Sequence, residues 1–343
     1  KIVLVASNNE SIEKLEVDRK KVIAAKACPR KHTANPPEKA DSKTPPQINR
    51  NLRLENTVWQ ASSKFEHSLY GLTPLKDRLR ELACSIIIAD LRKQAGLPVT
   101  RYGLNFAFLG APGTGKSLAA KKLASLLFEL GQLRTNRLTI ATRDALVGKF
   151  LGHTAPKTTA LLKRAKGGVF FLDHANALYK PDNPRDFGKE ALEIILQYME
   201  YHRTTFVFIF AGYAPQMSTF FFANQGLASR VSHHIHFPGY TIEELAGILS
   251  VVLLRMQFRI RPGAKVLLLQ YLKRQMLLPL FANARAVSTS LSALRPFLAA
   301  RLLCHFQDRR LTVDDVITFT PSDVLAFLRL NPAPAGKYGK SGL

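Results

Sequence analysis

The sequence predicts an α/β fold in which a parallel sheet is flanked by helices and followed by a small all-α domain. Short β-type runs alternate with helical patterns between residues 105 and 211, an order typical of parallel sheets covered on both faces. Only helical patterns appear from Thr241 onward. The chain has 343 residues, of which 46% are hydrophobic and 22% are charged, so it is able to bury a sizeable core.

The elements of the α/β part follow from periodicity and from start and stop signals. A long helix over 74–96 has Pro74 in its first turn and ends at Gly96, and its leucines and isoleucines recur at helical spacing. A short helix is expected within 57–70. The expected strands cover 105–109, 138–141, 169–173 and 205–211, and the helices between them cover 116–131, 156–166 and 189–202.

Residues 204–229 contain no charged side chain, which raises the question of a membrane span. Gly212 and Pro215 interrupt this segment, and its apolar run over 206–211 has only the length of a strand. We therefore expect a buried strand followed by a loop, and no membrane partner.

The all-α part begins at a capping box formed by Thr241 and Glu244, which precedes an apolar helix face. Further helices are expected near 264–276, 283–304 and 321–329. Residues 1–56 are irregular in pattern, and the stretch from Pro29 to Pro46 has the Pro, Asn, Lys, Ser and Thr composition of a linker. The predicted domains are a linker-like or disordered segment at 1–56, an α/β domain at 57–238, a helical domain at 239–330 and a flexible tail at 331–343.

The charge and cysteine content argue against a nucleic-acid-binding protein, a disulfide-rich fold and a structural zinc site. Lys and Arg number 49 against 25 Asp and Glu, which gives a formal net charge of +24. This excess is spread along the chain without a run of more than three basic residues, so nucleic acid is not the expected partner. Cys28, Cys84 and Cys304 show no CxxC spacing, so neither a disulfide framework nor a structural zinc site is expected.

The segment GAPGTGKS at 110–117 fits the P-loop pattern, and it lies between an apolar strand and an amphipathic helix. Glycines let backbone N–H groups surround phosphate oxygens, and the helix that follows directs its positive end at the anion. Lys116 is expected to reach the β- and γ-phosphates, and the Ser117 hydroxyl to ligate Mg²⁺. The predicted nucleotide-binding residues are Gly110, Ala111, Pro112, Gly113, Thr114, Gly115, Lys116 and Ser117.

A second part of the expected nucleotide site is Asp173, which ends the apolar run VFFL at 169–172. At the carboxyl edge of a parallel sheet this carboxylate would face the P-loop and help to hold Mg²⁺. Together with Ser117, Asp173 is the predicted metal site, and ATP with Mg²⁺ is the predicted cofactor pair.

Five further phrases of the sequence are GLTPLKDRLRE at 71–81, TRDALVG at 142–148, GHTAPKT at 152–158, FPGY at 237–240 and FANAR at 281–285. Together with the P-loop and Asp173, these phrases resemble the AAA+ ATPases, and more narrowly the red-type Rubisco activases of the CbbX family. The similarity extends over roughly 71–330, and GHTAPKT is its most specific part.

The resemblance implies a ring hexamer, of one or of several kinds of subunit, that uses ATP to remodel Rubisco blocked by a sugar phosphate. It implies that the ring pulls on the C-terminal tail of the Rubisco large subunit and that ribulose bisphosphate is an allosteric ligand. Such activases occur in plastids of red-lineage algae and in bacterial cytoplasm. The N-terminal segment favours the plastid stroma, with a bacterial-type cytoplasm as the alternative.

The resemblance also assigns roles to single residues. Phe150, Leu151 and Gly152 resemble the pore loop, where an aromatic side chain grips an extended peptide through apolar contact. Arg230 matches the arginine finger that reaches a neighbour's γ-phosphate, although the family's usual Arg two residues earlier is Ala228 here. Arg285 resembles the sensor-2 arginine of the helical domain.

One position departs from the family pattern. After the Walker-B Asp, such ATPases carry a Glu that polarises the attacking water, whereas this sequence has His174. A neutral imidazole is able to accept a proton near pH 7–8, but it has a different reach and no negative charge. Tyr213 lies where a polar sensor residue is often found. These changes predict weakened hydrolysis with retained nucleotide binding, so His174 joins Asp173, Arg230 and Arg285 as a candidate catalytic residue.

Three functions remain open from the sequence: an ATP-driven remodeller of Rubisco, a hydrolysis-impaired regulatory subunit of a mixed hexamer, and a nucleic-acid-handling AAA+ protein. Only the charge supports the third. His233, His234 and His236 could suggest a metal site, but they fall where the family has its last strand, so sheet-edge histidines are the preferred interpretation.

Overall fold

The computed structural model describes residues 60, 63, 71–99, 103–180, 183, 186–203, 206–278, 281–305 and 312–332. All of them belong to one compact unit that begins at Ile48. The predicted linker at 1–56, most of the expected helix within 57–70, and the tail beyond 332 lie outside the described residues.

Five parallel strands form one sheet in the order β2-β3-β4-β1-β5, which confirms the predicted fold class. The central strands β1, β3 and β4 are almost entirely buried, because helices cover both faces of the sheet. The edge strand β5 alternates between buried and exposed residues and contains the three histidines, as expected. The strands are β1 Phe106–Gly110, β2 Leu138–Ala141, β3 Val169–Leu172, β4 Val207–Gly212 and β5 His233–Phe237.

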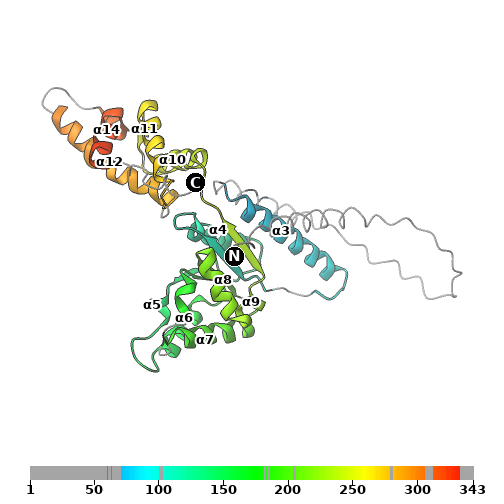
Figure 1. Cartoon of the computed structure of the whole chain (residues 1–343). Coiled ribbons are helices and arrows are strands. Elements are labelled where there is room, and N and C mark those ends of the chain that lie inside the picture. Colours follow the sequence, from blue (N-terminus) through cyan, green and yellow to red (C-terminus); the bar gives the residue numbers. More distant parts are fainter. Residues whose placement is uncertain are drawn as a thin grey trace, which may run out of the picture. The chain divides into compact units, whose positions relative to one another are not determined.

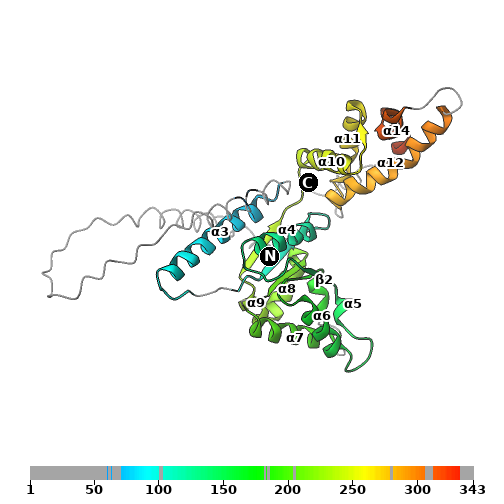
Figure 2. The same cartoon turned by 180° about the vertical axis from the view of Figure 1, so that it is seen from behind.

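The helices of the α/β part cover the sheet on two sides (Figures 1 and 2). α3 and α4 pack on one face around Phe106 and Phe108. α6, α7, α8 and α9 pack on the other face around Phe170, Phe208 and Phe210. The helices are α3 Thr73–Gln94, α4 Lys116–Glu129, α5 Arg143–Leu146, α6 Thr154–Ala165, the 3-10 turn η1 Ala175–Leu178, α7 Gly188–Tyr201, α8 Ala214–Ala223 and α9 Gln225–Arg230.

The prediction of a loop after the strand at 206–211 is wrong. β4 is followed by α8 and α9, and Pro215 lies in the first turn of α8 instead of breaking a helix. A proline is tolerated there because the first N–H groups of a helix have no partner within the helix. Among the described residues, no helix combines the length and the apolar character needed to cross a bilayer.

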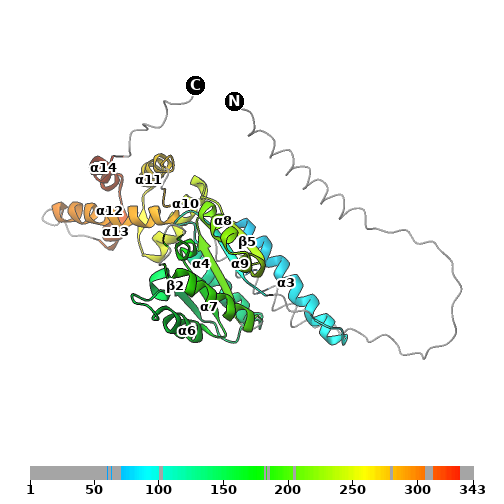
Figure 3. The same ribbon diagram turned by 60° about the horizontal axis from the view of Figure 1, so that its bottom comes forward.

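The C-terminal part is helical with its own buried core, and Figure 3 shows α10, α11, α12 and α14 grouped together. The capping box at Thr241 is confirmed, because the side chains of Thr241 and Glu244 bond each other's backbone N–H groups. The expectation of helices alone misses a parallel pair of two-residue strands, which are too short to leave a periodic pattern. The elements are α10 Ile242–Arg255, β6 Arg259–Ile260, α11 Pro262–Gln275, α12 Ala284–His305, α13 Val313–Ile317, β7 Thr318–Phe319 and α14 Pro321–Leu330.

Candidate nucleotide site

The P-loop connects the end of β1 to the start of α4. Gly113 and Gly115 have φ angles of 71° and 91°, in the left-handed region that glycine adopts without steric cost. Gly113 meets a second requirement, since a Cβ atom there would lie 1.9 Å from the carbonyl oxygen of Ala282. The loop therefore has the curled backbone that phosphate binding requires, and it also lies directly against the helical domain.

Lys116, the first residue of α4, is bonded to the backbone of this loop. Its Nζ donates hydrogen bonds to the carbonyl oxygens of Gly110 at 2.8 Å and of Ala111 at 2.7 Å. Burial lowers the pKa of Lys116, the Asp173 carboxylate opposes this shift, and the Arg285 guanidinium adds to it. The three charged groups therefore influence one another, as expected if they face a common site.

A cavity of about 180 Å³ lies between the P-loop and the carboxyl ends of β3 and β4. The predicted site residues that line it are Gly110, Pro112, Gly113, Gly115, Lys116, Ser117, Asp173, His174 and Arg285. Asp173 follows β3 and Tyr213 follows β4, because parallel strands bring their carboxyl ends to one edge. The fold thus brings together residues that are up to 175 positions apart.

The donor set of this cavity fits a magnesium nucleotide. Ser117 and Asp173 provide hydroxyl and carboxylate oxygens, which are the ligands that Mg²⁺ prefers. The described residues contain no cluster of three or more His, Cys, Asp or Glu side chains able to hold a metal alone. Mg²⁺ commonly relies on substrate phosphates and waters in addition to one or two protein oxygens, so these two residues fit the role of holding it beside a bound triphosphate.

His174 has a left-handed backbone with a φ angle of 51°. Its backbone N–H donates to Oδ1 of Asp173 at 3.0 Å. The imidazole is exposed, and its ring centre lies 6.4 Å from that of Tyr213. Both rings therefore face the cavity at the two positions where the sequence departs from the family pattern.

Two residues of the helical part that were not among the predicted site residues donate hydrogen bonds to backbone carbonyl oxygens of the P-loop. The Tyr240 hydroxyl donates to the Thr114 carbonyl oxygen at 3.1 Å, and Asn283 Nδ2 donates to the Pro112 carbonyl oxygen at 3.1 Å. Asn283 Oδ1 also accepts from the Tyr240 N–H at 3.1 Å. Burial, with a smaller contribution from Glu244, raises the pKa of Tyr240 to about 12, so this hydroxyl stays protonated and remains a donor.

The segment proposed as a pore loop lies outside this cavity. Phe150 and Leu151 are 67% and 83% exposed, and Gly152 has a φ angle of 79°. The Phe150 ring contacts the His153 ring edge-to-face, with 5.5 Å between the centres. The aromatic side chain is therefore available to solvent at the tip of a turn.

The GHTAPKT phrase anchors this turn at its base. Lys157 Nζ donates to the carbonyl oxygens of Asp144 at 2.6 Å and of Val147 at 2.9 Å. Thr158 Oγ1 donates to the Leu146 carbonyl at 3.1 Å, and Thr154 Oγ1 accepts from the backbone of Gly148 at 3.1 Å. Three side chains of α6 thus tie the loop to the end of α5, which gives this phrase a structural role.

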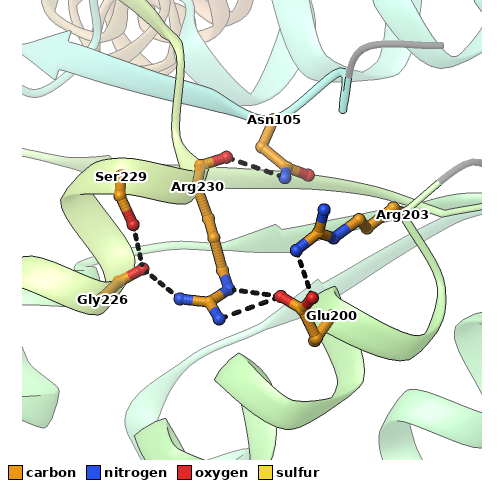
Figure 4. A network of polar contacts seen from close by, with 6 residues as sticks. All are labelled: Asn105, Glu200, Arg203, Gly226, Ser229 and Arg230. Carbon is orange, nitrogen blue, oxygen red and sulfur yellow. Dashed lines mark hydrogen bonds and ion pairs between the residues drawn. The ribbon is translucent and has the colours of Figure 1, made fainter. Parts of the chain in front are cut away.

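Arg230 is also separate from the nucleotide cavity. It is the last residue of α9, and its guanidinium bonds to Glu200 of α7 (Figure 4). The proposed site residues therefore fall into three groups: the P-loop cavity with Arg285, the exposed turn with Phe150, and Arg230 beside α7.

A curled P-loop after β1, an acidic residue at the end of β3, which β4 separates from β1, and a helical lid in contact with the loop define an ATPase of the P-loop class. Residues 106–238 match the ATPase family associated with various cellular activities (AAA). Residues 241–331 match the AAA lid domain. The AAA domain of FIGL-1 in complex with ADP has a related fold, with a TM-score of 0.53 and 15% identity over 78% of this chain and 84% of that one.

Curated relatives narrow the class. A protein CfxQ homolog of Guillardia theta is 46% identical, covering 78% of this chain and 91% of that protein. The chloroplastic ribulose bisphosphate carboxylase/oxygenase activase of Cyanidioschyzon merolae is 43% identical, covering 80% and 94%. The chromosomal protein CbxX of Cupriavidus necator is 43% identical, covering 78% and 84%. The chain belongs to this family of AAA ATPases, the CfxQ/CbxX proteins and red-type Rubisco activases.

Proposed function

We propose that this chain is an ATP-driven remodeller of Rubisco that works as a subunit of a hexameric ring. The observation that carries the proposal is the 43% identity to a chloroplastic Rubisco activase over 94% of that relative's length. The exposed Phe150 supports it, because an aromatic side chain on a turn is able to grip a peptide without reading its sequence.

In this proposal the P-loop amides and Lys116 bind the phosphates of ATP, and Ser117 and Asp173 hold Mg²⁺. The magnesium ion would neutralise charge on the phosphate oxygens. Arg285 follows Asn283 by two residues in the segment that bonds the P-loop carbonyls. A change in the bound phosphates would therefore act directly on the helical domain, and through it on the neighbouring subunits of the ring.

The client in this proposal is the Rubisco large subunit, whose C-terminal tail the turn at 150–152 would pull. Ribulose bisphosphate is proposed as an allosteric ligand by resemblance to the same family. The proposed ring is either a homohexamer of this chain or a heterohexamer that also contains a second kind of subunit. The proposed compartment is the plastid stroma, with a bacterial-type cytoplasm as the alternative, since the relatives include both chloroplastic and bacterial proteins.

A second candidate function is a regulatory subunit of a mixed hexamer in which this chain binds ATP and hydrolyses it slowly. His174 in place of the family's Glu favours it, because general-base catalysis contributes about 10²–10⁴-fold. The His174 imidazole lies at the cavity beside Tyr213. Position 213 therefore supplies no carboxylate that could replace the Glu missing at position 174.

The test is ATP turnover by the purified full chain, with and without inhibited red-type Rubisco and ribulose bisphosphate. The remodeller predicts ATP turnover together with recovery of carboxylase activity. Phe150→Ala should abolish the recovery and keep the basal turnover, whereas Phe128→Ala, an exposed phenylalanine on α4, should change neither. Turnover that appears only after a Glu-bearing partner is added favours the regulatory subunit, and carboxylase recovery without ATP contradicts both.

A further inference from the structure

Arg230 is held by its own subunit through three different nitrogen atoms (Figure 4). Nε and Nη2 donate to the same carboxylate oxygen of Glu200, at 3.1 and 2.9 Å. Nη1 donates to the Gly226 carbonyl oxygen at 2.8 Å. The Arg203 guanidinium pairs with the second oxygen of Glu200, so both carboxylate oxygens are used.

The main chain at Arg230 is fixed as well. Asn105, which is buried, donates from Nδ2 to the Arg230 carbonyl oxygen at 3.0 Å and accepts the Phe208 N–H at 3.1 Å. Asn105 directly precedes β1, and the strand that follows Arg230, β5, pairs with β1 from His233 opposite Phe106. The end of α9 is therefore anchored to the sheet itself.

This anchoring places Arg230 at the amino end of the sheet, whereas the nucleotide cavity lies at the carboxyl end. The P-loop begins at Gly110, at the far end of β1 from Asn105. A five-residue strand spans about 16 Å. The guanidinium, directed at α7, is thus remote from the cavity of its own subunit. A phosphate that Arg230 contacts must belong to a second copy of the chain.

The hydrogen bonds leave part of the guanidinium free. Arginine has five N–H donors in a fixed planar fork, and three of them are used, one on each nitrogen. One N–H on each terminal nitrogen has no acceptor among the described residues. The side chain is 33% exposed. Such a pair of terminal donors is the geometry that binds two phosphate oxygens at once.

From this geometry we infer that Glu200 is a positioning residue, which orients Arg230 so that its two free donors face the phosphates bound by a neighbouring copy. The inference rests on the proposed function and on the arginine-finger role that the family resemblance implies for Arg230. A long, flexible side chain must otherwise find its productive rotamer for every turnover, and a displacement of about 1 Å can cost about 100-fold in rate. The hydrogen bonds from Arg203 and from Arg230 lower the pKa of Glu200, so the carboxylate stays ionised at neutral pH.

The first experiment measures single-turnover hydrolysis of radiolabelled ATP by full-length rings of the Glu200→Gln variant. Glutamine keeps the shape and removes the charge, so we expect a loss of about 10- to 100-fold in the rate with unchanged affinity for ATP. The pair is partly exposed and contributes little to stability, so the fold and ring size should be retained. Glu193→Gln is the matched control: Glu193 lies on the same helix, is exposed, and makes no ion pair within the described part of the chain.

The second experiment separates positioning from a defect inside the variant subunit. Lys116→Ala subunits should not bind ATP, but they carry an intact Arg230 and Glu200. Mixed with Glu200→Gln subunits, they supply correctly held arginines to neighbours that do bind ATP. The mixture should therefore hydrolyse ATP several-fold faster per Glu200→Gln subunit than that variant alone, and a Lys116→Ala mixture with Arg230→Ala subunits should behave in the same way.

The outcomes distinguish this inference from the proposed function. A Glu200→Gln ring as active as the wild type, while Arg230→Ala is impaired, overturns the inference alone. Rescue of Arg230→Ala without rescue of Glu200→Gln also overturns it, since Glu200 would then act within its own subunit. An Arg230→Ala ring as active as the wild type overturns the inference and leaves the proposed function standing, whereas a wild-type ring that hydrolyses no ATP overturns both.

Discussion

Asn283 joins the P-loop to the helical domain through its side chain. It donates to the Pro112 carbonyl, accepts from the Tyr240 N–H and has a left-handed φ angle of 49°. Replacing Asn283 by alanine removes these two hydrogen bonds and a third, longer one to the Phe281 carbonyl oxygen, and it leaves the backbone in a conformation that alanine disfavours. We therefore expect Asn283→Ala to lower the free energy of unfolding and to weaken nucleotide binding.

The magnitude follows from the burial of the two partners. The Tyr240 N–H is buried, and leaving it without an acceptor costs about 1–3 kcal/mol. The Pro112 carbonyl is partly buried, so the loss of its hydrogen bond from Asn283 costs about 1 kcal/mol. The left-handed backbone adds about 1–2 kcal/mol for alanine, a cost that glycine avoids. Asn283→Ala should thus destabilise more than Asn283→Gly, which isolates the side-chain bonds.

The assay is urea unfolding of the full chain followed by circular dichroism, with ATP affinity measured by calorimetry on the same samples. Asn331→Ala is the matched control, because within the described residues the Asn331 side chain makes one hydrogen bond, to the Phe327 carbonyl oxygen at the end of α14. If Asn283→Ala unfolds within about 0.5 kcal/mol of the wild type, the range of ordinary surface substitutions, then the contact we describe does not hold the P-loop.

Two further predictions concern catalysis and pH. His174→Glu should raise ATP turnover by up to about 10²–10⁴-fold, as measured by phosphate release, and an unchanged rate would count against the interpretation of His174. Burial, reinforced by the Arg78 charge, lowers the pKa of His233 to about 4, whereas the unfolded chain protonates this ring near pH 6.5. The unfolded state therefore binds more protons between these values, so stability should be complete above pH 6.5 and fall towards pH 4. In His233→Gln this part of the pH dependence, measured by urea unfolding, should disappear.

The parts of the fold that the sequence predicts well are those with local signals. The strand–loop–helix unit around Lys116 is predicted nearly to the residue, because an apolar run, a glycine-rich turn and an amphipathic helix follow one another directly. The strand that ends before Asp173 is predicted for the same reason. β6 and β7 are missed, since two residues cannot show a period.

The residues that the sequence analysis misses act through contacts across long separations. Asn283 is 171 positions from its partner Pro112, and Tyr240 is 126 positions from Thr114. Glu200 and Arg230 are 30 positions apart and lie on different helices. Tyr240 and Asn283 fall in the FPGY and FANAR phrases, so the resemblance marked their positions without indicating what they bond. Those hydrogen-bond partners are visible only once the helical domain is packed on the P-loop.

The central claim is that the loop at 110–117 binds a magnesium nucleotide with help from Asp173. Titration calorimetry of the full chain with ATP tests it most directly, with and without Mg²⁺, beside Lys116→Ala and Asp173→Asn. We expect heat of binding for the wild type, no binding for Lys116→Ala, and binding by Asp173→Asn that no longer responds to Mg²⁺. Equal affinity in the wild type and Lys116→Ala, or no heat with the wild type, would contradict it.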